Sequence, residues 1–201
     1  LKHQPNDSFF IWPGAGIQLR STLYVYCNSL KNQGSGAFGF AASGNDLLAE
    51  IKLPEMKVTA YRQLPDFDGI NFGTGFVQDT HNNWVYVYGQ KYIASKVECD
   101  LYVARFYADN PLTKWQFFNG HTWANEVKNA IIIAKQTGVS GTFHISRVKN
   151  KICLLSSQLS INCDSGTEIY GATAADFSGP FTERKKIYAI DDRLNGHTPF
   201  F

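Results

Sequence analysis

Short stretches in which apolar and polar residues alternate recur along the chain, and each is bounded by turn-forming residues. They are rich in β-branched and aromatic residues, which is typical of β-strands with a buried face. The stretches follow a fixed order of four, and the second member is the most alike, at 23–26, 85–88 and 152–155. We therefore expect three consecutive units of four antiparallel strands. The other expected strands are the first at 17–19, 75–77 and 143–145, the third at 38–41, 101–104 and 169–172, and the fourth at 59–62, 114–118 and 186–190.

A four-stranded unit repeated every sixty to seventy residues or so is typical of a β-propeller blade with long loops. A two-layer sandwich can hold as many strands, but nothing in it requires their order to repeat. The sequence therefore predicts an all-β fold. We expect one partial propeller domain over 1–201, with blades at about 9–64, 70–120 and 139–190 and the start of another at 197–201. Three blades do not close a ring, so we expect a longer protein or a ring completed by another copy.

Composition and charge narrow the classes of function. Lys and Arg are scattered and the formal net charge is only +2, so no basic patch of the kind that binds nucleic acid is present. No apolar run is long enough for a membrane span. The four cysteines form no C-x-x-C pair, which argues against zinc. Whether Cys27 pairs with Cys99 and Cys153 with Cys163, or all four stay free thiols, is left open.

Five short phrases resemble, in this order, the secreted five-bladed β-propeller proteins of glycosidase-like type, some of which degrade arabinan. They are FIWPG at 10–14, GINFGTG at 69–75, WVYVYG at 84–89, LYVAR at 101–105 and WQFFNGHTW at 115–123. The resemblance implies a secreted, periplasmic or cell-surface protein whose partner is a polysaccharide or oligosaccharide. Relatives that degrade arabinan use an acidic triad spread over successive blades, but that triad has no residue-by-residue match here.

Candidate chemistry gathers in the segments that connect the last strand of one unit to the first strand of the next. In a propeller these connectors lie on one face, around the central axis. The segment 65–70 carries Asp66 and Asp68, and 119–139 carries His121, Trp123 and Glu126, while 191–198 carries Asp191, Asp192 and His197. Glycoside hydrolysis needs two carboxyl groups, one to protonate the leaving oxygen and one to activate water or attack the sugar. The alternative is that these acids only cap turns.

Two hypotheses follow. In the first, the protein is a glycoside hydrolase whose catalytic acids are Asp68, Glu126 and Asp192, with one carboxyl pKa raised by its neighbours. Its substrate-binding residues are Trp12, Asn71, His121, Trp123 and His197. In the second, it is a non-catalytic carbohydrate-binding or scaffold propeller. Two carboxylates roughly 5–10 Å apart in one pocket favour the first, and acids paired with Lys or Arg favour the second. We expect no cofactor, although carboxylates and carbonyls near the axis could hold a structural Ca²⁺.

Overall fold

A computed structural model describes the chain at residues 9–32, 40–44, 46–93, 98–111, 114–135, 139–158 and 167–189. Within these residues the secondary structure is β-strand with one 3-10 turn and no α-helix. No helix there is long and apolar enough to cross a membrane. The segments around Cys163, Asp192 and His197 lie outside the described residues.

The first sheet follows the chain, in the order β1-β2-β4-β5, all antiparallel. Its strands are β1 (Phe9–Leu19), β2 (Thr22–Asn32), β4 (Leu47–Lys52) and β5 (Lys57–Gln63), and a short β3 (Phe40–Ala42) pairs with the end of β2. The expected third strand at 38–41 is therefore wrong, because the main third strand is β4. Of β3 and β4, it is β4 that pairs with the body of β2, and it buries Leu48 and Ala49.

The second sheet has the order β6-β7-β8-β9, again following the chain, and is extended at its outer edge. Its strands are β6 (Asn71–Asp79), β7 (Trp84–Tyr92), β8 (Cys99–Tyr107) and β9 (Gln116–Phe118). Two short strands, β10 (Trp123–Ala124) and β11 (Ala134–Lys135), pair with β9 and β8, and a 3-10 turn η1 (Val127–Asn129) lies between them. The long segment after β9 therefore folds back along its own sheet.

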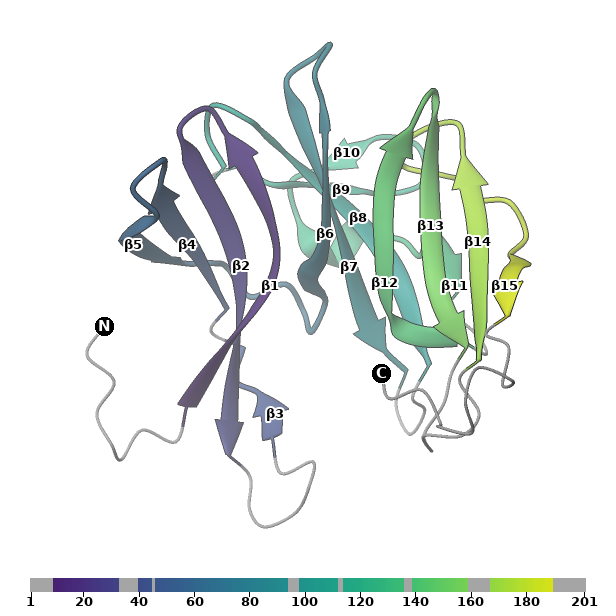
Figure 1. Ribbon diagram of the computed structural model, residues 1–201, viewed down its shortest axis with the longest axis horizontal. Helices are drawn as coiled ribbons and strands as arrows, with labels where there is room; N and C mark the ends of the chain where they lie inside the picture. The colour runs from purple at the N-terminus through teal and green to yellow at the C-terminus, as the bar shows by residue number, and fades with distance from the viewer. Residues whose placement is uncertain are drawn as a thin grey trace.

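The third sheet has the order β12-β13-β14-β15. Its strands are β12 (Val139–Val148), β13 (Lys151–Gln158), β14 (Glu168–Ala174) and β15 (Lys185–Ala189). Figure 1 shows the three sheets side by side, with the first strand of each sheet, β1, β6 and β12, toward the middle, and β6 contacts both of the others. Three antiparallel sheets in chain order, arranged by their first strands, confirm the predicted all-β propeller architecture.

Glycines let the first strands approach one another so closely. A Cβ on Gly14 of β1 would lie 2.5 Å from the carbonyl oxygen of Gly73 in β6, and one on Gly75 would overlap the side chain of Ile145 in β12. Any larger residue at these positions would push the strands apart. The sequence therefore places its smallest residues where the three sheets converge.

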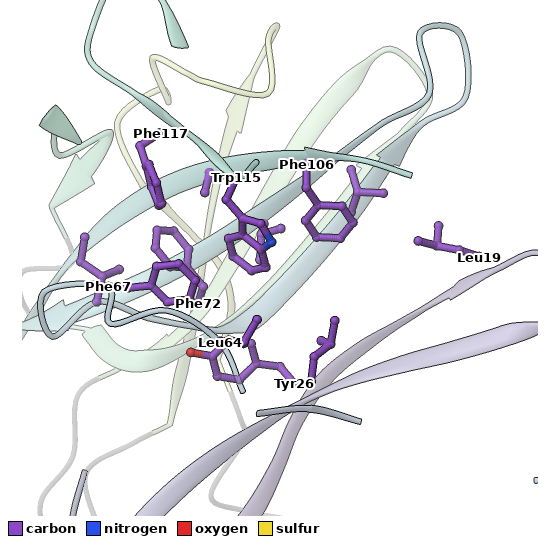
Figure 2. Close-up of a cluster of buried hydrophobic side chains, with 13 residues drawn as sticks. Leu19, Tyr26, Leu64, Phe67, Phe72, Phe106, Trp115 and Phe117 are labelled. Carbon is purple, nitrogen blue, oxygen red and sulfur yellow. The ribbon is translucent and has the colours of Figure 1, made fainter. Parts of the chain in front are cut away.

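The second sheet is buried on both faces, which ties the three sheets into one body. On one face an aromatic cluster joins it to the first sheet, as Figure 2 shows: Leu19, Tyr26 and Leu64 meet Phe72, Phe106 and Trp115. On the other face Tyr86 stacks on Phe177 with ring centroids 4.0 Å apart, and the Tyr88 hydroxyl donates to the Phe177 carbonyl at 2.8 Å. Of the cysteines in the described part of the chain, Cys27, Cys99 and Cys153 are free thiols.

Candidate functional site

A cavity of about 420 Å³ opens at the edge where β1, β6 and β12 begin, and we call it the axial cavity. All three sheets contribute to it, because the start of a first strand and the end of a second strand meet at the same edge of an antiparallel sheet. Its lining comprises Trp12, Asn28, Ser29, Leu30, Gly44, Asp46, Pro65, Asp66, Phe67, Gly69, Ile70, Asn71, Gln90, Tyr92 and Thr142.

Three amide side chains give this lining its hydrogen-bonding capacity. The Oδ1 atom of Asn28 is buried and accepts no hydrogen bond from the described residues. Asn71 accepts from the Gly73 backbone N–H through Oδ1 at 2.8 Å, which leaves its NH₂ group as a donor. Gln90 is buried and is held by Cys99, whose Sγ donates to Oε1 at 3.8 Å, and by the Tyr92 hydroxyl at 3.4 Å from Nε2. These amides are therefore fixed in position by strand ends.

Two aromatic rings stand at the rim of the axial cavity. Trp12 is 54% exposed and Tyr92 is 55% exposed, which is unusual for rings of this size on strands. Burial of its hydroxyl, with the nearby Cys99 thiol adding to it, raises the pKa of Tyr92. The phenol is therefore neutral near pH 7 and can both donate and accept a hydrogen bond.

Two carboxylates line the axial cavity, and their surroundings differ. Asp46 uses both oxygens: Oδ2 accepts from the buried Tyr26 hydroxyl at 2.7 Å, and Oδ1 accepts from the Ser29 backbone N–H at 2.9 Å. Asp66 is exposed and uses Oδ1 for the backbone N–H of Asp68 at 2.9 Å. A carboxylate has two acceptor oxygens, so Asp66 can still accept from a ligand.

The charged residues known to line the axial cavity are all acidic. Besides Asp46 and Asp66, the residues known to line the axial cavity are neutral, and none of them is Lys, Arg or His. Such a surface disfavours an anionic ligand, because like charges repel most where water is partly excluded.

Three of the sequence-predicted site residues fall at or beside the axial cavity. Trp12 and Asn71 line it directly. Asp68 does not line it, and its carboxylate is exposed and forms an ion pair with Lys91 at 3.1 Å. The acid of this connector that faces the axial cavity is Asp66, two residues earlier, in the same segment that the strand order had singled out.

The residues expected from the long segment after β9 lie elsewhere. Glu126 is exposed and pairs with Lys128 at 2.7 Å. The hydrogen bond and charge of Lys128 lower the pKa of Glu126, the opposite of the rise expected for a general acid. The Trp123 ring is half-buried and carries the Arg105 guanidinium 4.4 Å from its centroid. Asp68, Glu126 and Trp123 are therefore not among the residues known to line the axial cavity, because 119–135 folds back along the second sheet.

The remaining expectations stay predictions. His121 is exposed, and its backbone N–H donates to Asn119 Oδ1 at 3.1 Å. Asp192 and His197 lie beyond the described residues. Across the described ranges no group of three His, Cys, Asp or Glu side chains is placed to hold a metal ion.

Solved structures that resemble this chain include glycoside hydrolases and a hydrolase candidate. A hydrolase candidate from Bacteroides ovatus is 14% identical, with a TM-score of 0.69 over 94% of this chain and 48% of that one. An exo-β-1,3-galactanase from Phanerochaete chrysosporium is 13% identical, with a TM-score of 0.55 over 90% and 36% of the two chains. A thermostable family-43 glycoside hydrolase is 14% identical, with a TM-score of 0.51 over 85% and 53%. The chain thus spans about half or less of each structure.

Likeness at this level of identity shows a shared propeller fold and leaves the activity open. No curated protein sequence is similar enough to this chain to count as a relative. One family profile, that of the domain of unknown function DUF5005, matches residues 1–200. The chain therefore belongs to the DUF5005 family and carries the fold of the propeller glycoside hydrolases.

Proposed function

We propose that this chain is part of a secreted, five-bladed, carbohydrate-active propeller, and that the axial cavity binds a neutral polysaccharide or oligosaccharide. The observation that carries the proposal is the pair of exposed rings, Trp12 and Tyr92, at the rim of a cavity whose known lining includes amide side chains and no Lys, Arg or His.

The rest of the lining suits a sugar. The exposed rings of Trp12 and Tyr92 can pack on the apolar C–H face of a sugar ring. The Asn71 and Gln90 amides and the Asp66 carboxylate supply donors and acceptors for hydroxyl groups. A volume of about 420 Å³ lies within the range of roughly 300–1,000 Å³ that is usual for ligand sites.

The negative charge of the axial cavity determines which class of sugar it can bind. Asp46 and Asp66 make the cavity acidic, and its known lining has no cation to receive a uronate carboxylate. We therefore assign neutral glycans to this site and exclude polymers of uronic acids. The fold supports this assignment, since the structure of the galactanase named above was determined with galactose.

Hydrolysis of the bound glycan is a second candidate, favoured by one observation: Asp46 and Asp66 line the same cavity. A glycosidase needs such a pair of carboxyl groups. Against it, the ion pairs of Asp68 with Lys91 and of Glu126 with Lys128 agree with the binding hypothesis. Recognition of the glycan is therefore the primary proposal.

The test uses the full-length protein and a panel of neutral and uronic-acid polysaccharides, with binding measured by affinity electrophoresis and cleavage by release of reducing sugar. Trp12→Ala should weaken binding roughly fivefold to tenfold, the worth of about 1–1.5 kcal/mol of ring contact. Tyr188→Ala, at an equally exposed ring on β15, is the matched control and should bind as the parent does. Binding of uronic-acid polymers alone, or equal affinity of both variants, would overturn the proposal.

A further inference from the structure

A second cavity of about 630 Å³ lies directly beyond the wall of the first, and we call it the outer cavity. Pro65, Asp66 and Phe67 line both cavities, so three residues of one connector separate them. The far side of the outer cavity is formed by Trp115, which directly precedes β9, by Phe117 of β9, and by Asn125 before η1.

The shared wall is fixed in place. Leu64, Phe67 and Ile70 are buried, so every third residue of the connector points into the core. The Leu64 N–H donates to the Asp46 carbonyl at 2.8 Å, and the Ile70 N–H donates to the Phe67 carbonyl at 3.0 Å. Phe67 also stacks on Trp115 with ring centroids 4.8 Å apart, as Figure 2 shows for the surrounding cluster. The two cavities are therefore separated by a narrow ridge, residues 65–67, whose position is fixed by the core.

The lining of the outer cavity differs from that of the axial cavity, because its aromatic rings are almost fully buried and it includes a cation, Lys114. Its floor is aromatic, from Phe67, Trp115 and Phe117, and the indole N–H of Trp115 is already donated to the Pro111 carbonyl at 2.9 Å. The floor is thus apolar. Its polar groups are the Asn125 amide and the Lys114 ammonium, together with Asp66 on the ridge. Aromatic rings with a few convergent polar groups are typical of a site that recognises a polyhydroxylated ligand.

We propose that the outer cavity is a second glycan-binding subsite, and that one oligosaccharide occupies both cavities by crossing the ridge at Asp66. The inference rests on the proposed function of the axial cavity. It makes the ligand an extended chain of sugars, because a single sugar unit cannot reach both sides of the ridge. Asp66 then lies between two bound sugars, where its carboxylate can accept hydroxyl hydrogen bonds from either.

Length dependence follows from this arrangement. Once one part of a chain is bound in the axial cavity, its next sugars reach the outer cavity at high effective concentration. Affinity should therefore rise by at least about tenfold from the disaccharide to the longest oligosaccharide and then level off. A site confined to the axial cavity would level off at the shortest ligands.

The experiment is calorimetry of the full-length protein with two ladders, linear arabino-oligosaccharides and β-1,3-linked galacto-oligosaccharides from disaccharide to octasaccharide. Asn125→Trp fills the outer cavity from an exposed turn position, and Asn129→Trp adds the same ring in η1 away from the lining. A second variant, Lys114→Gly, removes the ammonium group. Glycine is chosen because the backbone at this position is left-handed, with φ 56°, a conformation that glycine adopts without strain.

The expected result is that Asn125→Trp abolishes the gain with length and leaves the affinity for the disaccharide unchanged. Lys114→Gly reduces the gain, and Asn129→Trp behaves as the parent. If the parent binds both short and long chains equally, or if Asn125→Trp keeps the parent's gain, the second subsite is wrong and the axial site stands. If no oligosaccharide of either ladder binds and Trp12→Ala changes nothing, the proposed function itself fails, and the subsite fails with it.

Discussion

Asp46 is the residue through which the axial cavity is tied to the core, and replacing it tests that connection. Its carboxylate accepts the hydroxyl of Tyr26 at 2.7 Å and the backbone N–H of Ser29 at 2.9 Å, and both donors belong to buried residues of β2. Burial, with the Asp46 charge adding to it, raises the pKa of Tyr26 well above its ordinary value. Tyr26 is therefore a neutral donor at neutral pH and well above it.

The expected loss in the free energy of unfolding follows from the two hydrogen bonds that Asp46 accepts. A hydrogen bond to a charged group contributes about 1.5–3 kcal/mol, and a buried donor left without a partner costs about 1–3 kcal/mol. Asp46→Ala leaves the Tyr26 hydroxyl and the Ser29 N–H without an acceptor, so we expect it to lower the free energy of unfolding by about 2–5 kcal/mol. Tyr26→Phe removes one donor and leaves the Ser29 bond, so we expect a loss of about 1–3 kcal/mol. Asp46→Asn keeps an acceptor and should fall between the parent and Asp46→Ala.

Urea titration of the parent, Asp46→Ala, Tyr26→Phe and the double variant that combines them gives a coupling energy between Asp46 and Tyr26. Residues that share a buried hydrogen bond typically show a coupling of about 0.5–3 kcal/mol. Additive effects within about 0.3–0.5 kcal/mol would refute the claim that the two side chains stabilise each other. An Asp46→Ala variant as stable as the parent would refute the anchoring role altogether.

Two further predictions concern groups away from the ridge. The Arg105 guanidinium lies 4.1 Å from the Trp84 ring centroid and 4.4 Å from that of Trp123. Arg105→Met should therefore lower the free energy of unfolding by about 1–3 kcal/mol. Urea titration measures this loss, with Lys151→Met at an exposed strand position as the control. Burial raises the pKa of the Cys99 thiol from 9.0 to about 11, so the folded state keeps a proton that the unfolded chain loses. The stability from this group is complete below about pH 9 and is lost as the pH rises towards 11, and Cys99→Ala should flatten that decline in titrations at several pH values; an unchanged slope would contradict the assignment.

The order of the strands was predictable because alternation with a period of two is a local property of the sequence. Where the alternation is short or follows a glycine-rich stretch, the prediction failed: β4, which begins at Leu47, was overlooked in favour of a strand at 38–41. That error also aligned Asp46 with Asp109 and Asp176, because an Asp follows each expected third strand by four or five residues, where it is expected to cap a turn. Asp176 does cap its turn, accepting from the Ser178 N–H at 3.0 Å, whereas Asp109 bonds the side chains of Arg20 and Asn83, which come from other turns.

The site was only half predictable, for a reason that lies in topology. Sequence reasoning followed the connectors into the first strands and so found Trp12, Asn71 and the segment of Asp66. It did not consider the ends of the second strands, although an antiparallel sheet brings them to the same edge. Asn28 and Gln90 lie there, each two residues after the end of the strongest strand repeat at 23–26 and 85–88, and these equivalent positions were a readable signal. The fold-back of 119–135 depends on the pairing of β11 with β8, which lies far earlier in the chain, and no local pattern encodes that pairing.

The chemistry of the carboxylates limits how hydrolysis can occur in this protein. A general acid must hold a proton in the folded enzyme, but Asp46 accepts two hydrogen bonds and Glu126 has its pKa lowered by Lys128. Of the two carboxylates in the known axial lining, Asp66 is the one with an oxygen that accepts no hydrogen bond from the described residues, and a glycosidase needs two carboxyl groups that reach the substrate. If the full-length protein cleaves a glycan, the second group must come from residues outside those described, with Asp192 the predicted one. Asp66→Asn and Asp192→Asn should then each reduce reducing-sugar release by about 10²–10⁴ while binding persists. Parent-like release by Asp66→Asn would instead place the chemistry away from the axial cavity.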